Sequence, residues 1–193
     1  MRQVVLYIAS SLDGYIARPG GDISWLNAPE FELPGEDYGY HAFYRSIDTT
    51  LMGNATYRAV LGFDVPFPYP DRTNYVFTRS DGHRDTGFVK FISGDIPFFV
   101  RKLKDEPGKD IWLVGGGEIN ALLLQHGLID RIILTLMPLT LGEGIPLFAP
   151  HTAQNRFELV ETWPFSNSVI HLTWQLIPDP GLIDDPASKY AGV

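Results

Sequence analysis

The chain of 193 residues contains no cysteine, which excludes disulfides, thiolate metal sites and cysteine nucleophiles. Basic residues are also few, since 15 lysines and arginines stand against 23 aspartates and glutamates, for a formal net charge of −8. They form no cluster that could follow a phosphate backbone, so we expect no nucleic-acid partner. No stretch approaches the roughly 18 to 20 apolar residues of a membrane span, and the N-terminus lacks the pattern of a signal peptide. We therefore expect a soluble cytoplasmic protein without membrane association.

Several familiar catalytic and binding motifs are missing as well. The five histidines show no metal-ligand spacing such as His-x-x-x-His, so no metal site is predicted. There is no Gly-x-Ser-x-Gly elbow, which disfavours a hydrolase. The Gly-x-Gly-x-x-Gly fingerprint of the classical dinucleotide fold and the P-loop ending are absent too. If a dinucleotide binds, it binds in another fold.

Segments of strand character alternate with segments of helical periodicity. Strands are predicted at 4–9, 49–52, 74–78, 88–92, 111–114 and 129–136, and helices at 37–46, 55–61, 96–104 and 118–125. A final antiparallel hairpin is predicted at 157–162 and 168–176. The pattern predicts an α/β protein with a central mixed, mostly parallel sheet flanked by helices and an antiparallel C-terminal edge hairpin. One domain would span residues 1–177, followed by a C-terminal tail at 178–193.

The most informative local feature is a run of three glycines between a strand and a helix. Val114 ends the apolar strand, Gly115, Gly116 and Gly117 follow, and Glu118 begins the helical pattern. Glycines let the backbone approach an anion closely, and the helix start points free N–H groups at the same place. The turn is therefore either a phosphate site or an ordinary strand-to-helix connection.

Two further strand ends have a similar character. Gly53 ends a strand, and Asn54, Ala55 and Thr56 begin a helix, which supplies a second set of free N–H groups. Thr78, Arg79 and Ser80 end another strand, and an arginine between hydroxyls suits a phosphate monoester such as the 2′-phosphate of an NADP-type cofactor. A routine connecting loop and a solvated arginine are the alternatives.

Acidic residues lie in or beside the segments that are expected to cover these turns. Asp13, Asp22, Glu36 and Asp37 could donate a proton or hold a polar heterocycle. The alternative for each is a turn or a helix cap. Trp25 is interpreted either as an aromatic lid over the substrate or as a core residue.

In order, these segments read Ser-Leu-Asp-Gly-Tyr-Ile-Ala at 11–17, Met-Gly-Asn-Ala-Thr-Tyr at 52–57, Phe-Thr-Arg-Ser at 77–80 and Val-Gly-Gly-Gly-Glu-Ile at 114–119. The order resembles the dihydrofolate reductase fold, and most of all the reductase domain of the bifunctional deaminase/reductase of riboflavin biosynthesis. The Ser-Leu-Asp-Gly stretch and the glycines ahead of Pro-Leu-Phe at 146–148 favour the riboflavin-type branch.

The resemblance implies NADPH as cofactor, a small-molecule substrate and a homodimer. The implied cofactor contacts are Ala9 and Ile16 beside the nicotinamide, Gly53, Asn54, Ala55 and Thr56 on the pyrophosphate and adenosine side, Thr78, Arg79 and Ser80 at the 2′-phosphate, and Val114, Gly115, Gly116, Gly117 and Glu118 at the pyrophosphate. For the substrate, Thr135 matches a threonine that supports the pocket of folate reductases. Asp37 falls, counting back from Gly53, where those enzymes carry the acid that binds the pterin.

Two departures from the family pattern stand out. Asn54 replaces the basic residue that usually follows Met-Gly, which weakens the case for NADPH over NADH. No proline-tryptophan pair precedes the helix at 37–46, although Trp25 could replace the aromatic. The leading hypothesis is an NADPH-dependent reductase of a small heterocyclic or sugar-derived substrate, with Asp37 or water as proton source. The alternatives are a non-catalytic module that binds a nucleotide or pterin, and an assembly protein that acts through its tail.

Overall fold

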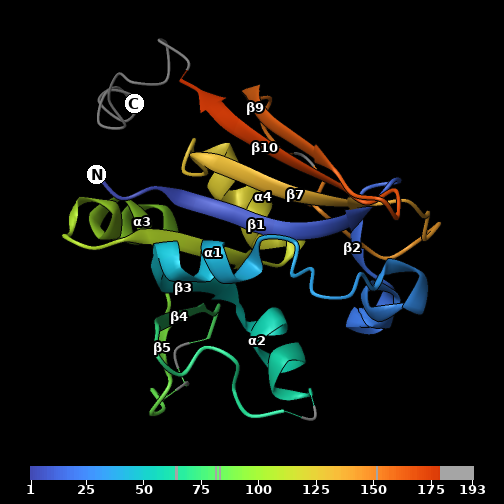
Figure 1. Cartoon of the computed structure of the whole chain (residues 1–193). Helices are drawn as coiled ribbons and strands as arrows, with labels where there is room; N and C mark the ends of the chain where they lie inside the picture. The colour runs from blue at the N-terminus through green and yellow to red at the C-terminus, as the bar shows by residue number, and fades with distance from the viewer. Residues whose placement is uncertain (64, 81, 83, 151, 179–193) are drawn as a thin grey trace.

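The computed structural model describes residues 1–63, 65–80, 82, 84–150 and 152–178. Its main sheet has eight strands in the spatial order β5-β4-β3-β6-β1-β7-β10-β9 (Figure 1). In chain order these are β1 (Val4–Ser11), β3 (Ile47–Gly53), β4 (Thr73–Phe77), β5 (Val89–Ile92), β6 (Asp110–Gly115), β7 (Arg131–Met137), β9 (Arg156–Pro164) and β10 (Ile170–Ile177). A separate two-stranded sheet pairs β2 (Tyr15–Ala17) with β8 (Ile145–Pro146).

Helices connect most of the parallel strands. The α-helices are α1 (Tyr40–Ser46), α2 (Asn54–Leu61), α3 (Ile96–Asp105) and α4 (Gly117–Gln125). Three short 3₁₀ turns lie between β2 and α1, namely η1 (Pro19–Gly21), η2 (Ser24–Asn27) and η3 (Pro29–Phe31). None of the helices in the described part of the chain is long and apolar enough to cross a membrane.

The strand directions confirm the predicted fold class. From β5 to β7 every neighbouring pair in the sheet is parallel, whereas β10 runs antiparallel to both β7 and β9. Val4 packs with apolar side chains of α3 and α4, while its neighbour Val5 packs with Phe43 of α1 and Tyr57 of α2. Because successive strand residues point to opposite faces, α1 and α2 cover one face of the sheet and α3 and α4 the other (Figure 1).

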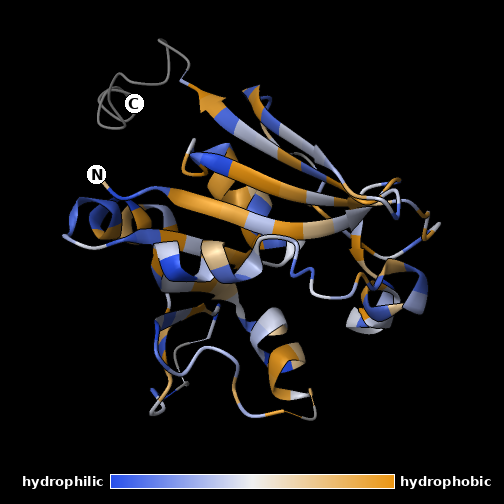
Figure 2. Ribbon diagram, in the orientation of Figure 1, coloured by the Kyte–Doolittle hydropathy of each residue, from blue (hydrophilic) through white to orange (hydrophobic). Residues whose placement is uncertain are grey.

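The sequence explains where these elements begin and how deeply they are buried. Most of β1 has the hydrophobic colour in Figure 2, and Val4 to Leu6 are fully buried at the centre of the sheet. Toward the carboxyl end of β1 the hydrophobic colour fades, where Ser10 and Ser11 lie. Helix α3 begins at a capping aspartate, because the side chain of Asp95 accepts from the Phe98 N–H at 2.9 Å.

Some predicted boundaries shift in the structure. The helix predicted at 37–46 begins only at Tyr40, because Gly39 has a φ of 78° and is not helical. Helix α2 includes Asn54, one residue before the predicted start. The small β2–β8 sheet was not predicted, since two- and three-residue strands carry no periodicity to recognise. The predicted tail at 178–193 lies outside the described residues from 179 onward.

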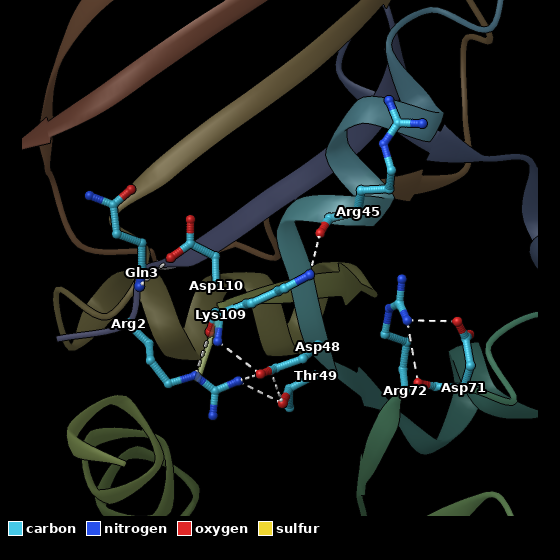
Figure 3. A network of polar contacts seen from close by, with 9 residues as sticks. All are labelled: Arg2, Gln3, Arg45, Asp48, Thr49, Asp71, Arg72, Lys109 and Asp110. Carbon is cyan, nitrogen blue, oxygen red and sulfur yellow. Dashed lines mark hydrogen bonds and ion pairs between the residues drawn. The ribbon is translucent and has the colours of Figure 1, made fainter. Parts of the chain in front are cut away.

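A polar network holds the amino ends of three strands together (Figure 3). Arg2 is 7% exposed, and its guanidinium binds the carboxylate of Asp48, the Thr49 hydroxyl at 2.7 Å and the Lys109 carbonyl at 2.5 Å. Asp48 also accepts from the Lys109 N–H at 2.8 Å. The N–H of the next residue along, Gln3, donates to the carboxylate of the residue that begins β6 at 3.0 Å. The network therefore joins the start of β1 to β3 and β6.

Candidate cofactor and substrate site

The carboxyl ends of β3 and β6 form the centre of the candidate site. The two strands are neighbours, but the chain leaves β3 through α2 toward β4 on one side and leaves β6 through α4 toward β7 on the other. The two helices also lie on opposite faces of the sheet. In open α/β sheets, ligands bind at such a switch point, and both helices begin there with N–H groups that have no intrahelical acceptor.

The three glycines after β6 let the starts of α2 and α4 lie against each other. Gly115 and Gly116 have φ values of 110° and 83°, which side-chain-bearing residues rarely adopt. A Cβ on Gly116 would lie 2.9 Å from the Thr56 hydroxyl, and a Cβ on Gly117 would lie 2.3 Å from the carbonyl oxygen of Pro146. The Thr56 hydroxyl also donates to the Gly115 carbonyl at 3.0 Å. Close packing requires these glycines, and the same packing brings two predicted phosphate turns together.

The turn after β4 reaches the same place through an exposed ion pair. Arg79 Nη2 lies 2.7 Å from Glu118 Oε2, and the two side chains are 89% and 78% exposed. The buried hydroxyl of Thr78 accepts from the Ser80 N–H at 3.2 Å, which shapes the turn. Because an exposed ion pair contributes little to stability, Arg79 can leave Glu118 for another anion. The structure thus brings together all three turns that the sequence singled out.

The loop after β1 crosses this edge of the sheet and is firmly tied down. The carboxylate of Asp13 accepts from the Ser11 hydroxyl at 2.5 Å and from the N–H groups of Leu141 at 3.1 Å and Gly142 at 2.7 Å. These bonds, that of Ser11 first, lower the pKa of Asp13 to about 2. Ala9 in β1 and Ile16 in β2 stay half-buried at the two ends of this loop.

Comparison with known proteins identifies the family of this chain. The family model of the RibD C-terminal domain matches residues 2–171. The chain belongs to the RibD C-terminal domain family. Its relatives include two Bacillus subtilis (strain 168) proteins described as uncharacterized, YwjB and YyaP. YwjB is 42% identical over 168 residues, covering 87% of this chain and 95% of YwjB. YyaP is 31% identical over 184 residues, covering 90% and 94%.

Solved structures confirm the fold of this RibD C-terminal domain. A Shewanella sp. PV-4 protein, named as a candidate riboflavin biosynthesis protein, matches with a TM-score of 0.80 and 28% identity, covering 92% of this chain and 100% of that one. A second match, with a TM-score of 0.67 and 19% identity, is the Thermotoga maritima diaminohydroxyphosphoribosylaminopyrimidine deaminase/5-amino-6-(5-phosphoribosylamino)uracil reductase. It covers 91% of this chain but 57% of that one. Dihydrofolate reductase from Enterococcus faecalis, complexed with NADP(H), gives 0.65 at 19% identity and covers 90% and 96%. At 19% identity the last two matches show a shared fold alone.

Within this RibD C-terminal domain, Asp37 has the capping role that the sequence left open. Its carboxylate accepts from the N–H groups of His41 at 2.8 Å and Gly39 at 2.9 Å and contacts the His41 ring. The bond from the His41 N–H, followed by that from its ring, lowers the pKa of Asp37. Bonds from Ser24 likewise lower the pKa of Asp22. Both carboxylates therefore act in the structure as acceptors for backbone N–H groups, Asp22 in a turn and Asp37 at the start of α1.

The other two predicted substrate residues lie in different environments. Thr135 is buried in β7, with Ala9 as its partner in β1 and His171 as its partner in β10. Trp25 is 5% exposed and belongs to a small core cluster with neighbours such as Met137. A lid aromatic needs an open face, so the lid interpretation is corrected to the core alternative.

Sequence analysis missed the polar and aromatic side chains of the edge hairpin. His171 and Thr173 of β10, with Glu161 and Trp163 of β9, line a cavity against the start of α1. The sequence does contain a signal for this grouping. Residues two apart on a strand point to the same face, so 171 and 173, and likewise 161 and 163, lie side by side on their strands. Among the described residues, no three histidine, aspartate or glutamate side chains gather as a metal ion would require.

Proposed function

We propose that the protein is an NADPH-dependent reductase that transfers a hydride to an electron-poor C=N or C=O carbon of a small heterocyclic or sugar-derived substrate. The observation that carries this proposal is the meeting of three turns at one switch point of the sheet, two of them helix starts and the third containing Arg79. Membership of the RibD C-terminal domain family and the likeness of the fold to reductases support it.

The residues at the switch point fit such a cofactor. The first N–H groups of α2 and α4 would bind the pyrophosphate, and the glycine at position 116 lets the two helix starts lie against each other. Arg79, once released from Glu118, would bind the 2′-phosphate with Ser80 beside it. When bound, NADPH supplies the hydride and is left as NADP⁺.

The remaining steps belong to the chain itself. Ala9 and Ile16 would border the nicotinamide, and Thr135, paired with Ala9 on the next strand, would support the substrate carbon beside it. Holding the two reacting groups in one orientation is the main contribution that such a site makes to the rate. The substrate heteroatom takes its proton from water, because Asp13 and Asp37 both have lowered pKa values.

Cofactor titration tests the proposal and the role of Arg79 together. NADPH and NADH are titrated separately into the protein while cofactor fluorescence is followed. Arg79→Ala is expected to weaken NADPH by about 10- to 100-fold, the effect of a lost charged hydrogen bond, and to leave NADH nearly unchanged. Arg101→Ala, an exposed arginine in α3, is the matched control and should change neither. Equal weakening of both cofactors would remove Arg79 from the 2′-phosphate.

A non-catalytic module that binds a nucleotide or pterin is the second candidate. The hydrogen bonds of Asp13, Asp22 and Asp37 favour it, because each carboxylate already accepts from a backbone N–H as a turn former or a cap. The loss of NADPH absorbance is followed with dihydrofolate, pyrimidines of the riboflavin pathway and aldehydes. Tight NADPH binding without oxidation across this panel would favour the module over the reductase.

A further inference from the structure

A cavity of about 320 Å³ lies between the start of α1 and the β9–β10 hairpin. Its size is at the lower end of the range for small-molecule pockets. The walls combine aromatic rings, carboxylates and one histidine. These are Tyr38, Trp163, Phe165, Glu36, Glu161 and His171.

The strand register connects this cavity to the proposed reaction centre. Ala9 pairs with Thr135, Thr135 with His171, and His171 with Trp163, so the four residues form one row across β1, β7, β10 and β9. Paired residues of neighbouring strands point to the same face. At about 4.8 Å between strands, His171 lies about 10 Å along the row from Ala9. A flat heterocycle of two rings spans a distance of that order.

The charge of the cavity selects its ligand. Glu36 and Glu161 contribute carboxylates, and no lysine or arginine is among the described residues that line the cavity. Ionised carboxylates only accept hydrogen bonds, so they suit amino groups and ring N–H groups. A phosphate would meet like charge in the same small space, which costs binding energy.

The aromatic side chains and the histidine favour a flat ring. Trp163 is 60% exposed at the edge of the cavity, which leaves its indole open to stacking. His171 is half-buried, and burial lowers its pKa, which disfavours the charged form of its ring. Its Nε2 atom is buried without a hydrogen-bond partner among the described residues. None of the described residues of this wall offers the cationic contacts that a phosphate ester needs.

We propose that this cavity binds the substrate ring of the reductase, and that this substrate is a flat heterocycle with amino or ring N–H donors and no phosphate group. The inference rests on the proposed function, and it separates this chain from the Thermotoga protein, whose name describes a phosphoribosyl substrate. Glu161 and Glu36 are then the residues that determine specificity, and Trp163 provides the stacking surface.

The test compares two ligands that differ only in a phosphate. Binding of 6-hydroxymethylpterin and of its phosphate ester to the full-length protein is measured by pterin fluorescence, without cofactor. The free pterin is expected to bind about tenfold more tightly or better. Glu161→Gln should narrow this preference and Glu161→Lys should reverse it. Trp163→Ala should weaken both ligands about tenfold through lost stacking. Glu158→Gln, an exposed glutamate elsewhere on β9, is the matched control and should leave both affinities unchanged.

Each outcome bears on one of the two proposals. Equal or tighter binding of the ester by the unmodified protein, no binding of either ligand, or a preference that Glu161→Lys leaves intact would overturn the cavity assignment. Cofactor binding is measured separately by NADPH fluorescence. If NADPH fails to bind while the pterin preference holds, the reductase proposal fails and the selectivity of the cavity stands.

Discussion

Arginine–carboxylate pairs of opposite character lie where the strands of the sheet begin and where they end. We call these two sides the amino edge and the carboxyl edge. At the amino edge, the Arg2 side chain is 6% exposed and contacts Asp48, which is 41% exposed (Figure 3). At the carboxyl edge, the pair of Arg79 and Glu118 is 89% and 78% exposed. Arg2 also binds a hydroxyl and a backbone carbonyl, whereas Glu118 is the one described polar partner of Arg79.

The difference separates a structural arginine from one that is free to bind a ligand. Removing a buried charge from its partners leaves those partners unsatisfied, so a pair such as Arg2 and Asp48 does not exchange. An exposed pair forms and breaks at little cost because water replaces each partner. The same side-chain chemistry therefore holds strands together at the amino edge, and at the carboxyl edge it leaves Arg79 able to exchange Glu118 for another anion, as the proposed cofactor role requires.

Gly117→Ala is expected to have the largest effect, because it disturbs the carboxyl edge through the backbone. The new Cβ would lie 2.3 Å from the Pro146 carbonyl oxygen, so the segment around β8 or the start of α4 must move. We expect a loss of about 3 kcal/mol in the free energy of unfolding, as for other overpacked positions, together with weaker NADPH binding. Urea denaturation and cofactor fluorescence measure the two effects. Gly87→Ala, where a Cβ meets nothing within 4 Å, should change neither.

Arg2→Ala should affect stability alone. It removes the buried guanidinium and leaves the Lys109 carbonyl and the Thr49 hydroxyl without the hydrogen bonds that Arg2 donates, while Asp48 loses its cationic partner and keeps the Lys109 N–H. Since Asp48 keeps access to water, we expect the free energy of unfolding, measured by urea denaturation, to fall by about 2 kcal/mol. This is less than the full cost of a buried unpaired charge. NADPH affinity of the folded protein should stay unchanged. Lys102→Ala, an exposed residue of α3, is the control, and a shift in cofactor affinity with Arg2→Ala would break the division between the two edges.

Local sequence patterns predicted the parts of the molecule that local chemistry dictates. The strand–glycine–helix turns at Gly53 and Gly115 occur where they were predicted, because backbone conformation and helix starts are fixed within a few residues. The mostly parallel sheet followed from the alternation of strands and helices. The turns could be recognised separately, and the family resemblance implied that they share one cofactor, since the strand order that brings them together is not contained in the periodicity alone.

The roles of single side chains depended on tertiary contacts and were predicted less well. Asp37 could be an acid or a cap, and only the positions of Gly39 and His41 favour the cap. Trp25 could be a lid or a core residue, and its burial beside Met137 is a long-range fact. The edge hairpin was interpreted as a structural closure, because its polar residues acquire meaning only when α1 lies opposite them.

Glu118→Gln tests the same comparison through a smaller effect, in which NADPH affinity is expected to rise and not to fall. It removes the carboxylate that competes for Arg79 and a negative charge at the start of α4, where a phosphate would lie. We expect NADPH to bind about two- to fivefold more tightly, the scale of an exposed pair, with little change for NADH. Fluorescence titration at low salt gives the largest signal, because salt screens exposed charges. Glu106→Gln, an exposed glutamate after α3, should have no effect, and weaker NADPH binding by Glu118→Gln would contradict the competition.

The smallest expected effect concerns Asp13, the exposed acid that ties the β1 loop to the backbone at Leu141 and Gly142. The pKa of Asp13 is lowered from 3.8 to about 2 in the folded protein. The ionised carboxylate therefore stabilises the fold at pH values above about 4, and this contribution is lost as the pH falls from about 4 to about 2. Asp13→Asn should therefore flatten the dependence of the free energy of unfolding on pH in this window, measured by urea denaturation. Asp105→Asn, at the end of α3, should keep the original slope. An unchanged slope with Asp13→Asn would mean that the loop is held by its β2–β8 pairing rather than by the carboxylate.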